Sequence, residues 1–401
     1  MAKIAILGLG TVGTGVAEVL DRHAEAIAKK AGQPVEVKYI LGRHPYPDSP
    51  YGHLVVQDFS VIENDPEVTV VVECIGGCEL PWKYTTRALN AGKSVVTSNK
   101  AVVAEYGDQL LTLARRRGLH YLFEASVGGG IPVLRPLASC LTANEITQVC
   151  GILNGTTNYI LTKMIREGLS FDAALREAQE KGYAEADPSA DVEGLDACRK
   201  ICILGSLAFG QHIYPRQVAT QGITALTSRD VALAQAGGMK IKLLGRALRL
   251  PQGGVTAFVA PHLVDREAPL ATVEDVFNAV VVWGDAAGEV MFYGRGAGKL
   301  PTASAVVSDI IDAVQDQEDW LMDWAPGTEE PLVSHWKLEM PWYFRTGEPV
   351  HRITQALGQV RLLTSGQAPG ELGVLTGPMS RETLAKLTQG LDMALCLPVR
   401  A

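Results

Sequence analysis

The chain has 401 residues, which is enough for two or three domains, and its 47% hydrophobic and 20% charged residues are typical of a globular protein. Its formal net charge of −8 argues against nucleic acid or an anionic membrane surface as the main partner. The start of the chain lacks a cleavable signal pattern and no uncharged apolar run reaches transmembrane length, so the sequence predicts a cytoplasmic protein with neither a membrane nor a nucleic-acid partner.

A glycine-rich turn, GLGTVG, follows the first predicted strand (3–7) and precedes a predicted helix (15–30). In this context the three glycines of G-x-G-x-x-G permit a tight turn, a close approach of backbone amides to a pyrophosphate, and close packing of the helix on the strand. We therefore expect a Rossmann-type domain that binds a nicotinamide dinucleotide. The residues of this predicted site are Gly8, Gly10, Thr11, Val12 and Gly13.

The second predicted strand, residues 35–41, bears on the choice of cofactor. Sites for NAD usually place an acid near this strand end for the ribose 2′-hydroxyl, whereas an arginine suits the 2′-phosphate of NADP. Arg43 stands there and no acid does. The sequence thus favours NADP, although an Arg43 that is merely solvated would leave NAD open.

Polar residues follow a later strand of the same predicted sheet. Strands are predicted over 68–74 and 94–97, and Ser98, Asn99 and Lys100 come directly after the second of these. Ligands bind at the carboxyl ends of strands in such sheets, so we expect Thr97 to Lys100, including the predicted cofactor residues Ser98 and Lys100, to point into the cleft. The alternative for Lys100 is an ordinary lysine at the start of a helix.

A strand predicted over 120–126 carries Glu124 and runs into a loop with three successive glycines, residues 128–130. Backbone carbonyls in such a loop can turn inward, and a hard cation prefers oxygen ligands. The alternative is that the loop only crosses between domains.

The second predicted domain begins near Leu134. Residues 151–161 read GILNGTTNYIL and predict a strand end that turns into a helix. Asn154, Thr156 and Thr157 offer amide and hydroxyl groups that suit either a small polar substrate or the cap of that helix.

An acidic stretch follows, with five acids within the twelve residues 185–196 and then Arg199 and Lys200. Gly182 is predicted to end one helix, and Asp187-Pro188 to begin the next, which would run from about Asp191 to 209. Asp196 and Lys200 are four residues apart, so they should share one helix face and form an acid–ammonium pair. The alternative is that this is a single Asp–Lys ion pair on the protein surface, which is common on exposed helices.

The rest of the chain predicts further strands and a separate tail. Strands are predicted over 240–250, 255–264 and 290–294, and a helix over 305–314. Residues 316–335 are an acidic linker. For the tail from Trp336 onward, the sequence predicts the order strand, helix, two strands, helix, strand.

The acidic stretch resembles the signature of homoserine dehydrogenases, since residues 178–200 fit A-x3-G-Y-A-x2-D-P-x2-D-V-x-G-x-D-x3-K. Similar blocks of the family are T-x-N-K at 97–100, N-G-T-T-N-Y-I-L at 154–161 and G-x-G-A-G at 294–298. The resemblance implies NAD(P)-dependent interconversion of L-aspartate 4-semialdehyde and L-homoserine in the biosynthesis of threonine, methionine and isoleucine.

The resemblance also implies roles for single residues. Lys200 would be the proton donor, Lys100 would lie beside nicotinamide and substrate, and Gly298 would lie near the cofactor. Carboxylates are needed for the α-ammonium of the substrate. The expected substrate-binding residues are Glu185, Asp191, Asp196, Lys100 and Thr156, and the expected catalytic residues are Lys200, Lys100 and Asp196.

A monovalent cation, usually sodium, is bound in the family near the glycine loop. The positions that correspond to its site here are Glu124, Val127, Gly129 and Ile131.

The resemblance to the family covers residues 3 to about 315. Together these inferences predict an α/β protein with four segments. The four segments are a Rossmann-type NAD(P)-binding domain (1–133, with a return segment of about 295–318), an α+β catalytic and dimerisation domain (134–294), a linker (319–335) and a small ACT-like βαββαβ regulatory domain (336–401). A homodimer or homotetramer is expected.

The tail departs from the family pattern. ACT domains of this kind usually carry an acid-Arg-Pro-Gly type of turn after the first strand, whereas residues 345–349 read RTGEP. We therefore expect weak or no inhibition by threonine, and we expect the exposed strand edges of the tail to pair with another copy.

Two other functions are compatible with the sequence. One is another NAD(P)-dependent amino-acid dehydrogenase, and the other is a non-catalytic NADP-binding sensor that kept the fold. The presence of Lys100, Asp191, Asp196 and Lys200 together argues against the sensor.

Overall fold

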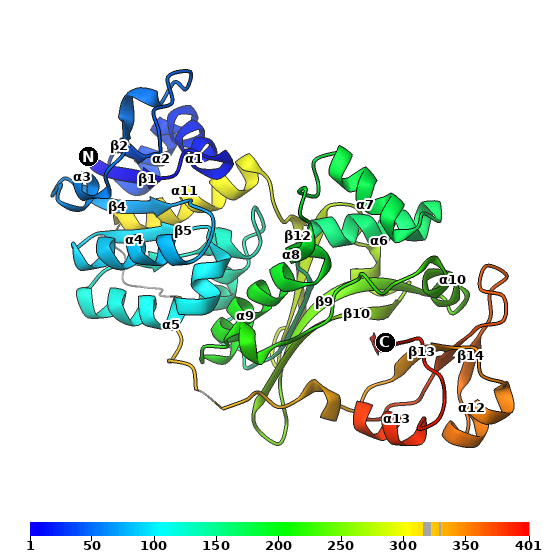
Figure 1. Cartoon of the computed structure of the whole chain (residues 1–401). Coiled ribbons are helices and arrows are strands. Elements are labelled where there is room, and N and C mark those ends of the chain that lie inside the picture. The colour runs from blue at the N-terminus through cyan, green and yellow to red at the C-terminus, as the bar shows by residue number, and fades with distance from the viewer. Residues whose placement is uncertain (316–321, 329, 401) are drawn as a thin grey trace. The chain divides into compact units, whose positions relative to one another are not determined.

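The computed structural model describes residues 1–315, 322–328 and 330–400, which form two compact units (Figure 1). The first unit holds residues 1–146, 202–215 and 283–329, and the second holds 147–201, 216–282 and 330–401. The end of the predicted return segment and the start of the predicted linker, 316–321, lie outside the described residues, as does 329. The domain boundaries inferred from the sequence stay predictions.

The first unit is built on a six-stranded parallel sheet in the order β3-β2-β1-β4-β5-β6. This order reverses between β1 and β4, as in doubly wound nucleotide-binding sheets, and it confirms the predicted Rossmann-type sheet. Its strands are mostly continuous buried apolar runs, because helices cover both faces of such a sheet. The strands are β1 (Ala2–Leu7), β2 (Val35–Leu41), β3 (Val55–Val56), β4 (Val68–Glu73), β5 (Ser94–Thr97) and β6 (Tyr121–Leu122).

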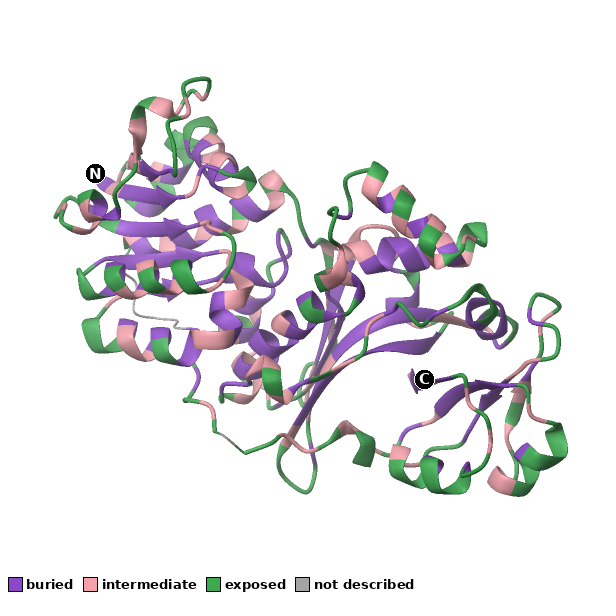
Figure 2. Ribbon diagram, in the orientation of Figure 1, coloured by how far each residue is buried: buried purple, intermediate pink, exposed green. Residues whose placement is uncertain are grey.

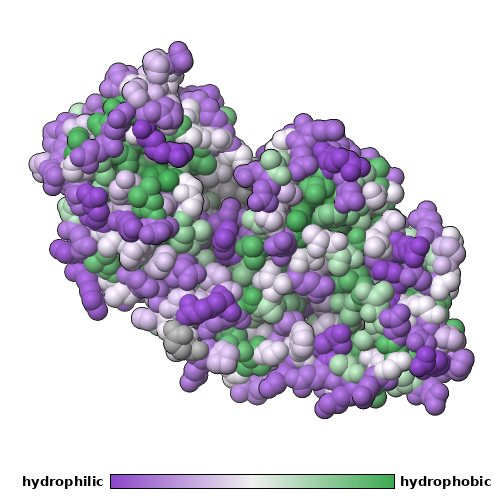
Figure 3. All heavy atoms as spheres, viewed as in Figure 1, coloured by the Kyte–Doolittle hydropathy of each residue, from purple (hydrophilic) through white to green (hydrophobic). Residues whose placement is uncertain are grey.

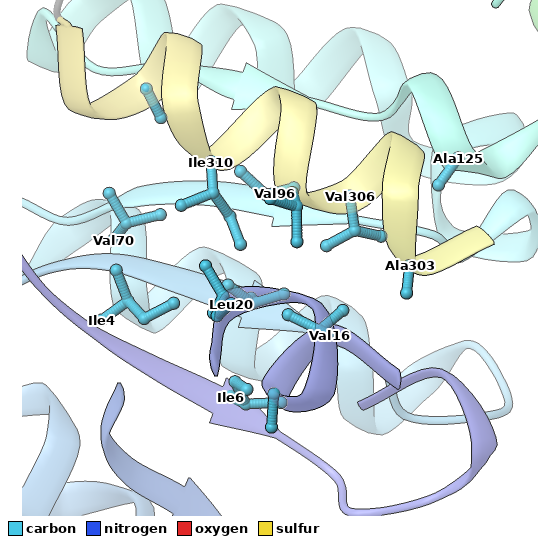
Figure 4. Close-up of a cluster of buried hydrophobic side chains, with 14 of the residues drawn as sticks. Ile4, Ile6, Val16, Leu20, Val70, Val96, Ala125, Ala303, Val306 and Ile310 are labelled. Atoms are coloured by element: carbon cyan, nitrogen blue, oxygen red, sulfur yellow. The ribbon is translucent and has the colours of Figure 1, made fainter. Parts of the chain in front are cut away.

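A helix from late in the chain completes the core of this unit. β12 (Gly288–Arg295) leads into α11, whose Ala303, Val306 and Ile310 pack with Val16 and Leu20 of α1 and with the sheet (Figure 4). The first unit is therefore discontinuous in sequence. Its helices are α1 (Thr11–Arg22), α2 (Ala24–Ala31), α3 (Phe59–Glu63), α4 (Glu79–Asn90), α5 (Lys100–Arg117) and α11 (Lys299–Gln315).

Three elements of the first unit differ from the prediction. The helix predicted over 15–30 is two helices, because the backbone of His23 leaves the helical region (φ −118°, ψ 24°). The strand predicted over 120–126 ends at Leu122, since the carboxylate of Glu124 accepts hydrogen bonds from backbone N–H groups of residues 133–135 and the chain must turn to reach them. α11 begins at Lys299, before the predicted 305, because Pro301 is tolerated in a first helical turn.

The second unit contains a mixed sheet in the order β11-β7-β9-β10-β16-β13-β15-β14. β10 pairs with β9 antiparallel and with β16 parallel, and the short β8 (Ala219–Thr220) also pairs with β10. The other strands are β7 (Ile146–Ile152), β9 (Met239–Arg249), β10 (Val255–Asp265), β11 (Phe277–Gly284), β13 (Trp342–Thr346), β14 (Arg361–Leu363), β15 (Leu372–Leu375) and β16 (Leu395–Arg400).

The helix predicted to start at about Asp191 is broken in two. Gly194 has a left-handed backbone (φ 84°) that ends α8, so α9 begins only at Leu195. Gly182 is also left-handed (φ 72°), which confirms the predicted helix stop. The helices of this unit are α6 (Gly155–Glu167), α7 (Phe171–Glu180), α8 (Ser189–Val192), α10 (Ser228–Ala236), α12 (Val350–Leu357) and α13 (Arg381–Leu387), while α9 (Leu195–Phe209) begins in this unit and belongs to the first from residue 202.

The tail has the predicted order of elements, β13-α12-β14-β15-α13-β16. One expectation is wrong, however, because β16 is not an exposed edge. It pairs with β10, with Leu263 opposite Val399, and the tail shares a buried core with Phe258 and Ala260 of β10. The strands β10 and β13 are largely buried (Figure 2). The tail residues buried in this core are Met340, Trp342, Phe344, Ile353, Val374 and Leu384.

A network of charged side chains joins the tail to α10. Arg345 Nε donates to Asp230 Oδ1 at 2.7 Å, and Arg345 also pairs with Glu371. Asp230 is fully buried and its other oxygen accepts from the backbone of Thr227, which forms a capping box at the start of α10. One carboxylate thus fixes both a helix end and the first strand of the tail.

On the face shown in Figure 3, hydrophilic residues are spread among smaller hydrophobic areas. Within the described residues, no helix combines the length and hydropathy that crossing a membrane requires.

Candidate functional site

A buried polar cluster of the second unit centres on Lys200. Its Nζ donates to Asp196 Oδ2 at 2.8 Å and to the carbonyl oxygen of Leu153 at 2.7 Å. Lys200 is 7% exposed and Asp196 is 4% exposed. The i,i+4 pair predicted from the sequence is therefore formed, and it is buried rather than a surface pair.

Asn154 holds the acids of this cluster in place. It caps α6, where its Oδ1 accepts from the Thr157 N–H at 2.8 Å, and its Nδ2 donates to Asp191 Oδ1 at 2.7 Å and to Asp196 Oδ2 at 2.9 Å. Burial, and then the charge of Asp196, raises the pKa of Asp191. The sequence left Asn154 open between substrate binding and capping, and the structure shows that it caps the helix and joins two carboxylates.

Two glycines beside the cluster lie against neighbouring segments of the unit. A Cβ on Gly155 would lie 2.8 Å from the carbonyl oxygen of Val276, and a Cβ on Gly194 would lie 3.1 Å from Thr220 Cγ2. The start of α6 therefore packs closely against the backbone of Val276, and the residue before α9 packs against Thr220. Asn154, at the start of α6, lies within hydrogen-bond distance of Asp196, in the first turn of α9.

The other predicted substrate residues lie on the neighbouring loop. Thr156 Oγ1 donates to the carbonyl oxygen of Tyr183 at 2.7 Å, which ties the start of α6 to the loop between α7 and α8. Glu185 is exposed on that loop, outside the buried cluster. The structure thus brings together Asp191, Asp196 and Lys200, and places Glu185 at the edge.

This arrangement can perform acid–base work on a small polar molecule. A buried ammonium next to a carboxylate can donate a proton to a developing oxyanion, and carboxylates can bind an ammonium group. The Leu153 carbonyl left no signal in the sequence, because any residue can supply a backbone oxygen.

The glycine turn of the first unit fits a dinucleotide. Gly8 is left-handed (φ 97°), and a Cβ on Gly13 would lie 2.0 Å from the Gly8 oxygen, so both positions require glycine. A Cβ on Gly10 would meet nothing within 4 Å, so the backbone there is open. Thr11 and Val12 begin α1, whose free N–H groups suit a pyrophosphate.

Other predicted cofactor residues lie in the same unit. Arg43 is exposed directly after β2. Gly298 (φ 126°) immediately precedes α11, and a Cβ on Gly15 of α1 would approach the oxygen of Lys299 to 2.9 Å. Gly298 therefore lies near the start of α1, where the pyrophosphate is expected.

The loop after β5 is held by Asn99. Its Oδ1 accepts from the N–H groups of Ala101 and Val102, which caps α5, and its Nδ2 donates to the oxygens of Ile75 and Gly77. Ser98 and Lys100 flank Asn99 and are both half-buried. The loops after β4 and β5 are thereby joined at the carboxyl edge of the sheet.

Sequence reasoning missed a buried acid at the end of β4. Glu73 has no exposed surface, and burial raises its pKa from 4.5 to about 7. The available signal was a single acid that ends an otherwise apolar strand, VTVVVE.

The glycine loop expected to bind a cation is closely packed. The backbone N–H groups of Val133 and Leu134 donate to Glu124 Oε1 at 2.7 and 3.0 Å, and the backbone N–H of Arg135 donates to Oε2 at 2.6 Å. Both oxygens of this carboxylate therefore already accept hydrogen bonds. Across 1–315, 322–328 and 330–400, no group of three His, Cys, Asp or Glu side chains could hold a metal. Backbone carbonyls of the loop are oxygen donors that a monovalent ion accepts. The loop includes Val127, Gly129 (φ 59°) and Ile131.

Comparisons with known proteins agree on one family. The model "Homoserine dehydrogenase, NAD binding domain" matches residues 8–124, and the model "Homoserine dehydrogenase" matches 132–311. The homoserine dehydrogenase of Pseudomonas aeruginosa is 46% identical over 314 residues, which is 78% of this chain and 72% of that protein. That of Bacillus subtilis is 43% identical over 318 residues, 78% of this chain and 73% of that protein.

Solved structures give the same result. A homoserine dehydrogenase from Thiobacillus denitrificans matches with a TM-score of 0.90 and 34% identity over 100% of this chain and 98% of its own. A hyperthermophilic archaeal homoserine dehydrogenase in complex with NADPH matches with a TM-score of 0.65 and 27% identity over 78% of this chain and 97% of its own.

Proposed function

Since the chain belongs to the homoserine dehydrogenase family and is an NAD(P)-dependent oxidoreductase that acts on a CH–OH group, we propose that Lys200 is its proton donor. The observation that carries this proposal is the buried contact of Lys200 with Asp196 and the Leu153 carbonyl. Asp196 keeps the ammonium oriented, and Asn154 keeps Asp196 oriented. The reaction interconverts L-aspartate 4-semialdehyde and L-homoserine.

The nicotinamide cofactor, when bound, supplies the hydride chemistry. The residues of this chain stabilise the charge that develops on the substrate and transfer its proton. When the aldehyde is reduced, negative charge develops on its oxygen. The Lys200 ammonium stabilises that oxygen and gives it a proton. In the oxidative direction the neutral amine of Lys200 takes the hydroxyl proton back, and Asp196 stabilises the ammonium that forms.

Substrate recognition is assigned to the acids around Lys200. Asp191 and Asp196 are positioned by Asn154 and bind the α-ammonium, with Glu185 supplied by the exposed loop. Thr156 fixes that loop through Tyr183. Lys100 orients the reacting end of the substrate, a role that rests on the family resemblance.

The activity is tested by following the absorbance of reduced nicotinamide with L-homoserine and NADP, and then with NAD. Turnover with L-homoserine but not with other amino acids supports the proposal. Turnover only with another amino acid would favour a different dehydrogenase, and cofactor binding without any turnover would favour a sensor.

Cofactor choice is predicted to depend on Arg43. We propose that NADP is preferred and that Arg43 binds the 2′-phosphate, so Arg43→Ala should weaken NADPH by about ten- to a hundredfold and NADH hardly at all. Fluorescence titration of both reduced cofactors measures this. Arg22→Ala, which removes an exposed arginine from the other end of α1, is the control. An equal loss for both cofactors would show that Arg43 is only structural.

Several finer assignments complete the proposal. A sodium ion would be held by the loop of Glu124, Val127, Gly129 and Ile131 through backbone carbonyls. The enzyme would be a cytoplasmic homodimer or homotetramer that serves the biosynthesis of threonine, methionine and isoleucine. Light scattering tests the oligomeric state, and activity measured with and without sodium tests the ion site.

The tail is proposed to be a divergent ACT-like regulatory domain. Its strands lie in the sheet in the order β16-β13-β15-β14. If the four strands of the tail are numbered along the chain, this spatial order is fourth, first, third, second. This order and the βαββαβ sequence of elements are those of a ferredoxin-like fold. The RTGEP turn begins with Arg345, which is engaged with Asp230 instead of being open to an effector.

A chain shortened to end near Pro331 is expected to keep turnover but change its oligomeric state. It loses stability, because burying a side chain the size of Phe258 is worth about 1.5–3 kcal/mol. Activity assays, light scattering and urea unfolding measure the three effects. In the full chain, threonine should inhibit weakly or not at all. Strong threonine inhibition that disappears on shortening would contradict this.

A further inference from the structure

The carboxylate of Glu73 connects two loops at the carboxyl edge of the Rossmann-type sheet. Its Oε1 accepts from the Ile75 N–H at 2.6 Å, in the loop after β4, and its Oε2 accepts from the Thr97 hydroxyl at 2.6 Å, at the end of β5. Thr97 Oγ1 in turn accepts from the Asn99 N–H at 2.9 Å. One buried side chain thus orders both the loop after β4 and the loop that begins α5.

These loops lie on the cofactor side of the unit. The backbone N–H of Cys74 donates to the Leu7 oxygen, and a Cβ on Gly8 would lie 3.2 Å from the Cys74 oxygen. The loop after β4 therefore touches the glycine turn that fits the pyrophosphate. In a sheet of this order the dinucleotide crosses from the β1 half to the β4 half, so the loops after β4 and β5 receive the nicotinamide half.

We propose that Glu73 is a positioning residue for the nicotinamide side of the cofactor site and that its charge favours the oxidised over the reduced ring. The inference rests on the NAD(P) binding of the proposed function. The oxidised ring carries a positive charge that the reduced ring lacks, so an ionised carboxylate beneath these loops attracts only the former.

The protonation of Glu73 gives the proposal a measurable signature. Burial raises its pKa to about 7, and the hydrogen bonds from Thr97 and Ile75 lower it without offsetting the burial. Leu7 of β1 and Thr97 of β5 flank it in the sheet, and the titratable groups that its charge influences are Cys74 and Tyr121. The pKa values of both groups are raised, so they stay neutral where Glu73 titrates.

The first measurement needs no cofactor. Infrared difference spectra of the protein should show loss of a protonated carboxyl band as the pH rises through about 7. Glu73→Gln should lack this change. Thr97→Val should move it to higher pH, because the Thr97 hydroxyl bond lowers the pKa of Glu73.

The second measurement compares NADP+ and NADPH binding by fluorescence titration between about pH 5.5 and 8.5, a range centred on that pKa. In the unaltered protein the affinity for NADP+ relative to NADPH should rise about fivefold or more with pH. This step should be absent in Glu73→Gln and shifted upward in Thr97→Val. Glu79→Gln is the matched control, because Glu79 is an exposed acid at the end of the same loop.

Each outcome decides the proposal. A step of unchanged size in Glu73→Gln, or no step in the unaltered protein, would overturn it. If Glu73→Gln does not fold, the upward shift in Thr97→Val supports the proposal and an unshifted step opposes it. Failure of the unaltered protein to bind either cofactor would refute the proposed function instead.

Discussion

Lys200→Ala should lower kcat at least about a hundredfold, the usual scale for lost general acid–base catalysis, and should leave NADP binding nearly unchanged. The reason is that Lys200 is the buried ammonium held by Asp196 and the Leu153 carbonyl, whereas the glycine turn belongs to the other unit. Steady-state kinetics and cofactor titration measure the two effects. Arg199→Ala is the matched control, since it removes the neighbouring cation of α9.

A structural explanation of the same loss can be separated from a chemical one. A small primary amine added to Lys200→Ala should restore part of the turnover, because it can enter the space of the missing side chain and supply an ammonium. Near-normal turnover in a well-folded Lys200→Ala protein would refute the assignment. Low turnover with equally weakened cofactor binding would point to a folding defect.

Asp230→Ala is expected to lower the free energy of unfolding by about 3 kcal/mol, the low end for breaking a buried ion pair, because Arg345 loses its buried partner and keeps only its pair with Glu371. Asp230 is fully buried, and the side chain of Arg345 is 10% exposed. The capping box of α10 is lost as well. Urea unfolding followed by far-ultraviolet circular dichroism gives the difference.

The double variant Asp230→Ala/Arg345→Met is the control for this prediction. Because it removes both charges and keeps apolar volume, it should recover much of the lost stability. Asp265→Ala removes an exposed acid at the end of β10 and should change little. If Asp230→Ala is as stable as the unaltered protein, the network does not hold the tail.

The sequence predicted the features that depend on local rules. The glycine turn after a strand has few alternative structures, and four-residue spacing places Asp196 and Lys200 on one helix face. The order of elements in the tail followed from short apolar segments between turns. These features need no knowledge of distant residues.

Features that depend on distant residues or backbone atoms were not predictable in this way. The breaks at His23 and Gly194 interrupt segments that look continuously helical, since helix propensity is a weak guide against tertiary packing. The early end of β6 is caused by Glu124 reaching amides of residues 133–135. The burial of Asp230 depends on Arg345, which lies far along the chain.

The parallel pairing of β10 with β16 has a consequence for synthesis on the ribosome. β9 and β10 can pair as soon as both have emerged, because they are adjacent in the chain and antiparallel. Phe258 and Ala260 then stay without their packing partners in the tail, since Trp342 and Phe344 are translated much later. Long-range pairing of this kind is slow and leaves apolar surface open to aggregation. The nascent chain should therefore depend on a chaperone most strongly between the emergence of β10 and that of β16.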